Sequence, residues 1–208
     1  MKTHRNIIII FVLIALLTTC SQHKNQADGI VKQLRDLPTP IPNEPSFGPG
    51  LPSEIKRRKL YGQLRALGNE AVYALSSGLQ DEDVNMRKNA ALCLNELSGG
   101  WFDNSRPRLD IRLGLSTLIN ALKDNDGSVR AWSAQAIGNI GPEAVQAVPF
   151  LIELLKSVDE GSRNSACIGL KGIGPAAKHA LPALQNALND PSSDVRKFSR
   201  WAIAYIDK

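Results

Sequence analysis

The histidine and cysteine side chains, which most often carry out covalent or metal chemistry, do not cluster in this 208-residue sequence. The three histidines, His4, His23 and His179, lie far apart, and no histidine–cysteine combination has the spacing of a zinc site. The sequence has no glycine-rich phosphate loop and no Gly-x-Ser-x-Gly turn that could expose a nucleophilic serine. We therefore expect no catalytic residue, no metal site and no cofactor, and predict that the protein is not an enzyme.

Cys20 is the cysteine whose neighbours predict a chemical role. Basic residues near the start are followed by an unbroken apolar run of eleven residues over 7–17. This run is too short to cross a bilayer, which takes about 20 residues, but it suits the apolar core of a signal peptide. The segment Leu17-Thr18-Thr19-Cys20 then resembles the lipobox of bacterial lipoproteins, in which the cysteine becomes the lipidated N-terminus after cleavage.

The lipobox resemblance implies a signal peptide over 1–19 and an acyl chain such as palmitate on Cys20. Thr19 departs from the family pattern, which has Gly, Ala or Ser there, so an ordinary secretory signal and an uncleaved anchor remain as alternatives. We expect a lipid-anchored protein of the cell envelope that faces the periplasm or the exterior. In a Gram-negative bacterium, Ser21 in place of aspartate predicts the outer membrane.

The region 20–53 is predicted to be a proline-rich flexible tether. Six of the twelve prolines lie between Pro38 and Pro52, and proline lacks an amide N–H and fixes φ. Fifteen residues of extended chain at ~3.1 Å each would span roughly 45 Å. The alternative is a ligand for a proline-recognition domain. A brief amphipathic helix before the prolines would use Ile30, Val31, Leu34 and Leu37.

Internal repetition is the strongest pattern in the chain. Four segments, which start at Leu79, Leu122, Leu155 and Leu188, each end an apolar helix, turn through a polar loop and reach an arginine eight residues later. Small and apolar residues recur six, seven and ten residues after each arginine, on one face of a second helix. The repeats predict a stack of helical hairpins.

The joints between repeats are also regular. Gly141-Pro142 and Gly174-Pro175 each end one helix and start the next, within the pattern Gly-Pro-x-Ala-x-x-Ala-x-Pro-x-Leu. This pattern closely resembles HEAT repeats, particularly the short subclass first described in phycobilisome lyases. The resemblance implies an all-α fold, a right-handed α-α superhelix, which here follows the signal peptide and the proline-rich linker.

In that family a loop aspartate and a helix-opening arginine form ladders between repeats. Ser157 replaces the aspartate in the third repeat, so we expect a weaker rung there. The residues that match the ladder positions are Asp81, Arg87, Asp124, Arg130, Arg163, Asp190 and Arg196.

The repeat domain is predicted to extend over 54–208. Stacked repeats need caps, and insertions fall in loops on one edge, which is often the binding edge. Cys93 and Cys167 fall on second helices two repeats apart, which favours buried thiols over a disulfide. The predicted parts are a capping helix at 54–67, repeats at about 68–98, 113–141, 142–174 and 175–208, and an insertion loop at 99–112.

Two sets of residues could form binding surfaces. The basic run Lys56, Arg57, Arg58 and Lys59 could contact anionic lipid, or could simply be a solvated helix face; export argues against nucleic acid. The other set flanks the buried stripe of the second helices, which line the concave side in the HEAT family, and includes aromatic residues that favour interfaces. The alternative is that these side chains fill the core between repeats or cover the open end of the stack. This set is Trp132, Gln135, Ile168, Phe198, Trp201 and Tyr205.

Together these features predict a membrane-tethered protein–protein interaction or scaffold module of the cell envelope. We expect a monomer with an unknown protein partner, a membrane contact through the lipid anchor, and no nucleic acid. The family resemblance leaves a lyase-like or chaperone-like relative of the phycobilisome HEAT proteins as one alternative. A structural spacer is the other.

Overall fold

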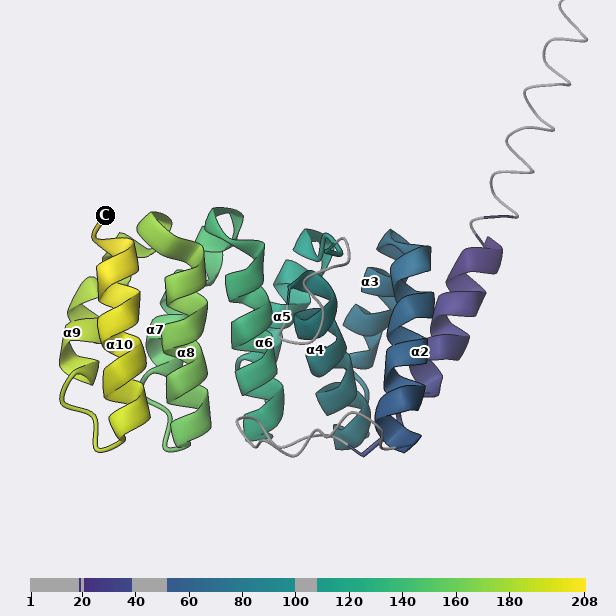
Figure 1. Cartoon of the computed structure of the whole chain (residues 1–208), viewed down its shortest axis with the longest axis horizontal. Coiled ribbons are helices and arrows are strands. Elements are labelled where there is room, and N and C mark those ends of the chain that lie inside the picture. The colour runs from purple at the N-terminus through teal and green to yellow at the C-terminus, as the bar shows by residue number, and fades with distance from the viewer. Residues whose placement is uncertain (1–18, 20, 39–51, 100–107) are drawn as a thin grey trace, which may run out of the picture.

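The computed structural model describes residues 19, 21–38, 52–99 and 108–208, and within these ranges the chain forms a row of helices without a strand (Figure 1). The predicted all-α solenoid is confirmed. The signal peptide, Cys20, most of the proline-rich segment and most of the insertion loop lie outside the described residues. No described helix is long and apolar enough to cross a membrane.

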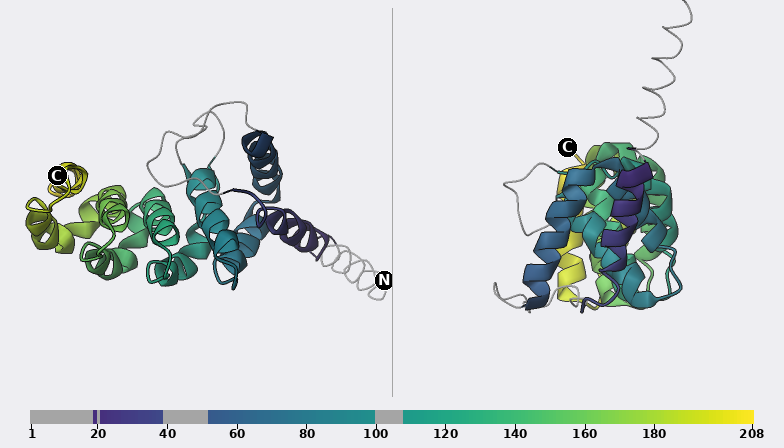
Figure 2. Two further views of the ribbon diagram at one scale, coloured as in Figure 1. Left: turned by 90° about the horizontal axis from the view of Figure 1, so that it is seen from below. Right: turned by 90° about the vertical axis from the view of Figure 1, so that its right-hand side faces the viewer.

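Each repeat pairs a first helix with a second helix, after α2 (Pro52–Leu67). The second helices and α2 lie along one side of the row and the first helices along the other (Figure 2, left). The first helices are α3 (Asn69–Gly78), α5 (Leu115–Ala121), α7 (Val148–Leu154) and α9 (Leu181–Ala187). The second helices are α4 (Val84–Ser98), α6 (Gly127–Ile140), α8 (Glu160–Ile173) and α10 (Ser193–Ile206).

The second helices begin and end at residues suited to those positions. Asp83, Asp126, Asp159 and Ser192 cap their N-termini, and each side chain accepts a hydrogen bond from a backbone N–H in the first turn. At the other end, Gly141 stops α6 with a φ of 84°, a left-handed conformation that favours glycine. Each polar loop of the sequence pattern thus sets where a second helix starts.

Short 3₁₀ helices precede three of the first helices. Pro149 and Pro182 lie in the first turn of α7 and α9, where the missing proline N–H costs no helical hydrogen bond. The residues before these prolines form tighter turns instead of extending the α-helix. The 3₁₀ helices are η1 (Arg112–Gly114), η2 (Pro142–Ala147) and η3 (Gly174–Ala180).

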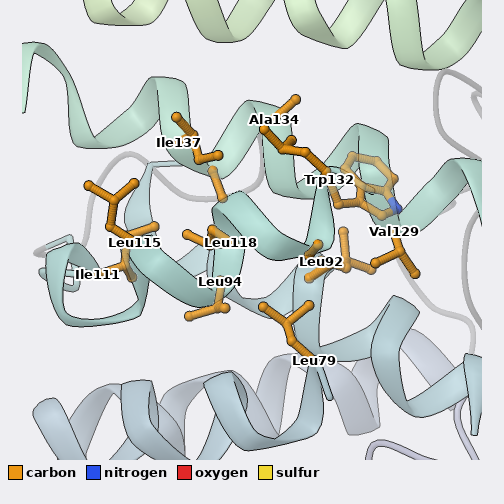
Figure 3. Packing of buried hydrophobic residues seen from close by; sticks show 14 of the residues in the cluster. Leu79, Leu92, Leu94, Ile111, Leu115, Leu118, Val129, Trp132, Ala134 and Ile137 are labelled. Carbon is orange, nitrogen blue, oxygen red and sulfur yellow. The ribbon is translucent and has the colours of Figure 1, made fainter. Parts of the chain in front are cut away.

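One apolar core runs the length of the row and is shared between neighbouring repeats. Between the first two repeats, Leu94, Leu118 and Ile137 are fully buried and face one another (Figure 3). Because each repeat buries its apolar face against the next, the stability of each repeat depends on its neighbours in the stack.

The α6–α8 contact depends on glycine. A Cβ atom added to Gly169 would lie 2.7 Å from the carbonyl oxygen of Ala134, and one added to Gly172 would lie 2.6 Å from Cα of Gly138. Both distances are shorter than a Cβ atom tolerates, so the two helix backbones approach closely because these side chains are absent.

The N-terminal segment differs from the predicted tether. Residues 21–32 are helical, a turn follows over 33–37, and the apolar side chains pack against α3 and α4. The tether predicted for 20–53 therefore does not extend over 21–38, because the apolar spacing before the prolines forms a docked helix. Residues 39–51 lie outside the described residues. The buried side chains are Ala27, Ile30, Val31, Leu34 and Leu37.

Polar contacts fix this segment between α2 and α4. Buried Arg57 donates from Nη1 to Oδ1 of Asn89 at 2.7 Å and from Nη2 to the carbonyl oxygen of Pro38. The Asn89 amide in turn donates to the carbonyl oxygens of Leu34 at 2.8 Å and Leu37 at 3.0 Å. One asparagine thus joins the capping helix, the N-terminal segment and the first repeat.

Candidate functional site: the inter-repeat ladder and an aromatic–lysine patch

Arginine–aspartate pairs link the loops of successive repeats. Arg87 donates from Nε to Asp124 at 2.7 Å and from Nη2 at 3.2 Å. Arg163 makes the same two-pronged contact with Asp190, at 2.8 and 2.9 Å. All four side chains are at most 18% exposed, and such charge-assisted pairs are the stronger class of hydrogen bond.

Each ladder residue also orders its own loop. Nη1 of Arg87 donates to the carbonyl oxygens of Asp81 and Glu82, and the other three ladder arginines repeat this contact. The carboxylate of Asp124 accepts from the backbone N–H of Asp126 at 2.8 Å. The geometry gives the ladder a structural role: it sets the rotation of one repeat relative to the next.

The rung at Ser157 is built differently. The Ser157 hydroxyl accepts from the N–H of Asp159 at 3.2 Å, as an aspartate would, but it does not reach Arg130. Arg130 donates instead to the Ser162 hydroxyl at 3.0 Å and lies 3.7 Å from the Asp159 carboxylate. One loop aspartate is thus replaced by two residues of the following helix turn.

Arg35 forms a rung that sequence reasoning missed. Its Nη2 donates to Asp81 at 2.7 Å, so the N-terminal segment extends the ladder by one step. The tether predicted at 20–53 includes Arg35. The available signal was the helical spacing of the apolar residues around it, between Val31 and Leu37.

Changing Asp190 to asparagine is expected to lower the free energy of unfolding by about 1.5–3 kcal/mol near neutral pH, because a hydrogen bond to a charged group contributes about that much. The hydrogen bond from Arg163 holds the pKa of Asp190 below its ordinary value of 3.8. The carboxylate therefore stabilises the fold at higher pH, and this contribution is lost as pH falls through the lowered pKa. In urea unfolding, the difference in free energy of unfolding between wild type and variant should become smaller as the pH is lowered from about 5 to about 2.

Asp110→Asn is the matched control for that experiment. A hydrogen bond from Arg112 also lowers the pKa of Asp110, but this pair is exposed and joins residues only two apart. We expect little change in stability at any pH. Equal losses from the two substitutions would show that the ladder contributes nothing specific.

The predicted second-helix surface divides into a buried and an exposed part. Trp132 is 8% exposed and lies beside Val129 and Leu92 (Figure 3). Gln135 is also buried, and its amide donates to the Ser165 hydroxyl of α8 at 3.1 Å. As a correction, Trp132 and Gln135 therefore belong to the inter-repeat core, because this flank of one second helix meets the next second helix.

The exposed part lies on α10. Trp201 and Tyr205 are 46% and 51% exposed, and Phe198 is half-buried, as is Ile168 on the neighbouring helix α8. The Phe198 and Trp201 rings meet edge to face, with centroids 5.1 Å apart and an interplanar angle of 82°. The structure thus brings together three of the six residues proposed for this surface, namely Phe198, Trp201 and Tyr205.

Three lysine ammonium groups lie over these rings. Lys171 of α8 lies 5.7 Å from the Trp201 centroid and 5.1 Å from that of Tyr205. Lys197 lies 4.9 Å from the Trp201 centroid, and Lys208 lies 4.5 Å from that of Tyr205. All are within the range of cation–π attraction. We call this set the aromatic–lysine patch: Phe198, Trp201, Tyr205, Lys171, Lys197 and Lys208.

The basic run of the capping helix is not a uniform surface. Lys56, Arg58 and Lys59 are exposed, but Arg57 is 3% exposed and holds the N-terminal segment. As a correction, Arg57 is a structural residue and cannot contact lipid headgroups. The other three side chains keep the predicted lipid contact as a hypothesis.

Cys93 and Cys167 are buried, unpaired thiols. Burial raises the pKa of Cys93 to about 12 and that of Cys167 to about 11. Since the thiolate is the reactive form, neither side chain is suited to nucleophilic or metal chemistry at neutral pH. Among the described residues, no group of three or more His, Cys, Asp and Glu side chains could hold a metal ion.

Comparison with known proteins agrees with the repeat geometry. Residues 115–204 match the family model of HEAT repeats. No sequence of a curated protein matches the chain.

Several solved structures share the fold. One is an engineered protein, 22% identical, with a TM-score of 0.61 over 87% of this chain and 79% of the other. Another is a designed armadillo repeat protein in complex with the peptide (KR)4, 23% identical, with a TM-score of 0.60 over 86% and 80%. The complex of CpcE and CpcF of phycocyanin lyase from Nostoc sp. PCC7120 is 25% identical, with a TM-score of 0.54 over 81% and 70%. The likenesses show a HEAT- and armadillo-like repeat scaffold.

Proposed function

We propose that this HEAT-like scaffold is a lipid-anchored interaction module of the cell envelope, which holds a protein partner on the aromatic–lysine patch. The observation that carries the proposal is the exposure of Trp201 and Tyr205 side by side on α10. Tryptophan and tyrosine are over-represented among residues that dominate binding energy. On the inner second helices α4 and α6, the corresponding flank is buried in contacts between repeats.

The likeness to solved repeat proteins supports this function. The designed armadillo repeat protein is similar in fold and was solved with a peptide bound. A rigid row of second helices presents a long surface of fixed spacing, which suits an extended segment of another protein. The scaffold here is similar in fold, and two of its exposed aromatic side chains, Trp201 and Tyr205, lie together on α10.

The likeness to the CpcE–CpcF complex favours a lyase-like or chaperone-like subunit as the second candidate. Both described cysteines are buried, so a chromophore could not reach their thiols without opening of the repeats. A bilin-transfer assay with an acceptor protein separates the two: formation of a covalent product would establish the second candidate. A structural spacer would capture no partner at all.

The anchor proposed at Cys20 would hold the repeats close to the membrane. Six residues separate Cys20 from Ala27, the first buried residue of the docked N-terminal helix. Seven residue steps at a helical rise of 1.5 Å each would span about 10 Å, much shorter than the roughly 45 Å of a proline leash. In a Gram-negative cell, Ser21 favours the outer membrane as the site of anchoring.

Replacing Cys20 with serine is expected to abolish palmitate labelling and to move the protein from the membrane to the soluble fraction, because serine cannot carry the thioether-linked lipid. Metabolic labelling and cell fractionation measure both effects. Cys93→Ser, a buried thiol in α4, is the control and should stay labelled and membrane-bound. Retention of the Cys20→Ser variant on membranes would show that another anchor operates.

Truncation of the patch, in the double variant Trp201→Ala/Tyr205→Ala, is expected to reduce recovery of the crosslinked partner at least about tenfold, since a hot-spot side chain contributes about 2 kcal/mol or more. Tyr73→Ala is the matched control, because Tyr73 is 53% exposed on the first helix α3. Circular dichroism should show unchanged helicity for both variants. Equal recovery from the two would place the partner elsewhere.

A further inference from the structure

The outer face of α10 differs from the faces on which the other second helices pack against their neighbours. Four residues after each ladder arginine, α4, α6 and α8 carry Ala91, Ala134 and Cys167, all of which are 0% exposed. These small side chains lie where the next second helix packs. The corresponding residue of α10 is Arg200, which is exposed. A charged side chain there would be buried by a fifth repeat, or by a second copy stacked in the same way, so this end is built as a cap.

The surface around the rings is positively charged. Lys171, Lys197 and Lys208 lie at the Trp201 and Tyr205 rings, and none of these three lysines forms an ion pair within the described residues. The carboxylates along α10 are Asp194 in its first turn and Asp207 after its last turn, and Glu160 of α8 accepts a hydrogen bond from the Ser192 hydroxyl. Asp190 nearby is already bound by Arg163. The charged groups that lie at the rings themselves are the three lysine ammonium groups, so the immediate surroundings of Trp201 and Tyr205 are positively charged.

Resting on the proposed function, we infer that the partner presents an acidic segment with an apolar side chain, which lies across α8 and α10. Its carboxylates pair with Lys171 and Lys197, and the apolar side chain covers the exposed part of the Trp201 ring. The lysines are held near the ring faces at 4.9–5.7 Å, so little side-chain freedom is lost when a carboxylate binds. The designed armadillo protein bound to (KR)4 takes a peptide of the opposite charge.

An anionic membrane surface shares some of this chemistry but fits the patch less well. The patch combines side chains of two neighbouring helices, α8 and α10. The ring faces are also occupied by ammonium groups, which disfavours insertion into the apolar part of a bilayer. A peptide can follow the surface between the two helices without burying these charges in hydrocarbon.

The test measures binding of a defined acidic peptide by isothermal titration calorimetry. The peptide is a dodecamer of alternating Glu and Asp with Phe at its centre, the reference is (KR)4, and the protein is the full chain carrying Cys20→Ser so that no acyl chain contributes. We expect the acidic peptide to bind and (KR)4 not to bind. Raising NaCl from about 0.1 M to about 1 M shortens the Debye length from about 10 to about 3 Å and should weaken binding strongly.

The double variant Lys171→Glu/Lys197→Glu should weaken acidic-peptide binding at least about tenfold, since like charges would replace attraction. Lys156→Glu is the control, because Lys156 is exposed after α7 and pairs with Glu153. We expect the control to bind within about twofold of the parent. Equal affinity in the two variants would overturn the inference, as would tighter binding of (KR)4.

The second part of the experiment measures binding of the same protein to vesicles that contain phosphatidylglycerol. Binding to vesicles that depends on Trp201, without binding of the acidic peptide, would overturn the inference in favour of a membrane contact. Crosslinking of Trp201 to a protein in cells, together with no affinity for acidic peptides, would leave the interaction surface in place and reject only the acidic partner.

Discussion

Replacing Asn89 with alanine is expected to lower the free energy of unfolding by about 3 kcal/mol and to release the N-terminal segment. The Asn89 side chain is fully buried, accepts from Arg57 and donates to two backbone carbonyls. A hydrogen bond to a charged group is worth about 1.5–3 kcal/mol, and buried groups left without a partner cost about 1–3 kcal/mol more. Burial of the Arg57 charge makes the loss larger than for a neutral network.

Hydrogen exchange measures which part of the protein loses stability in the Asn89→Ala variant. Amides of residues 21–38 should lose protection in the Asn89→Ala variant far more than those of α8. Asn189→Ala, in the exposed loop after α9, makes the same chemical change away from this network and should leave both regions as protected as in wild type. Unchanged protection over 21–38 in the Asn89 variant would contradict the contact described between this segment and the first repeat.

The double variant Gly169→Ala/Gly172→Ala is expected to destabilise the protein by a net of about 1–4 kcal/mol. Each new methyl group meets backbone of α6, at 2.7 Å from the Ala134 oxygen and 2.6 Å from Cα of Gly138, so the helices must separate. Overpacking costs about 1–3 kcal/mol per site, whereas alanine gains up to about 1 kcal/mol of helix propensity. The overpacking term is larger, so urea unfolding should shift to lower concentration.

Gly161→Ala is the matched substitution in the same helix. A Cβ atom there would lie 3.7 Å from the Asp159 carboxylate, an ordinary contact. We expect this variant to be as stable as wild type or slightly more stable. If the double variant were also stabilised, the close approach of α6 and α8 would not be a feature of the molecule in solution.

The fold was largely predictable from the sequence because its signals are local. Each loop, from Leu122 to Arg130 for example, carries its helix stop, its cap and its ladder residues within nine positions. The Gly141-Pro142 joint likewise specifies a left-handed stop and a new helix start without reference to distant residues. Repetition of such local signals defines an all-α stack.

The site was less predictable because it depends on contacts between repeats. Trp132 and Trp201 occupy similar flanks of their helices, yet Trp132 is buried and Trp201 is exposed. The reason is that α8 packs next to α6, whereas no described second helix follows α10. The burial of Arg57 depends on Asn89 and on the carbonyl of Pro38, which are distant in sequence. A run of four basic residues gives no sign that one of them has buried acceptors.

The ladder and the glycine contact bear on function through rigidity. Arg163 and Asp190 join the loops before α8 and α10, the two helices that form the aromatic–lysine patch. Cys167 and Ser199 also meet in the same interface, at 3.3 Å. The spacing between Lys171 and Trp201 is thereby fixed before a partner binds, so less conformational freedom is lost on binding.

The most direct test of the proposed interaction surface is site-specific photocrosslinking in intact cells. A benzoylphenylalanine side chain placed at Trp201 should give one predominant crosslinked protein, while the same group at Tyr73, an equally exposed aromatic position on α3, should give none. Crosslinking at Tyr73 but not at Trp201, or the same products from both positions, would contradict the assignment of partner binding to the aromatic–lysine patch.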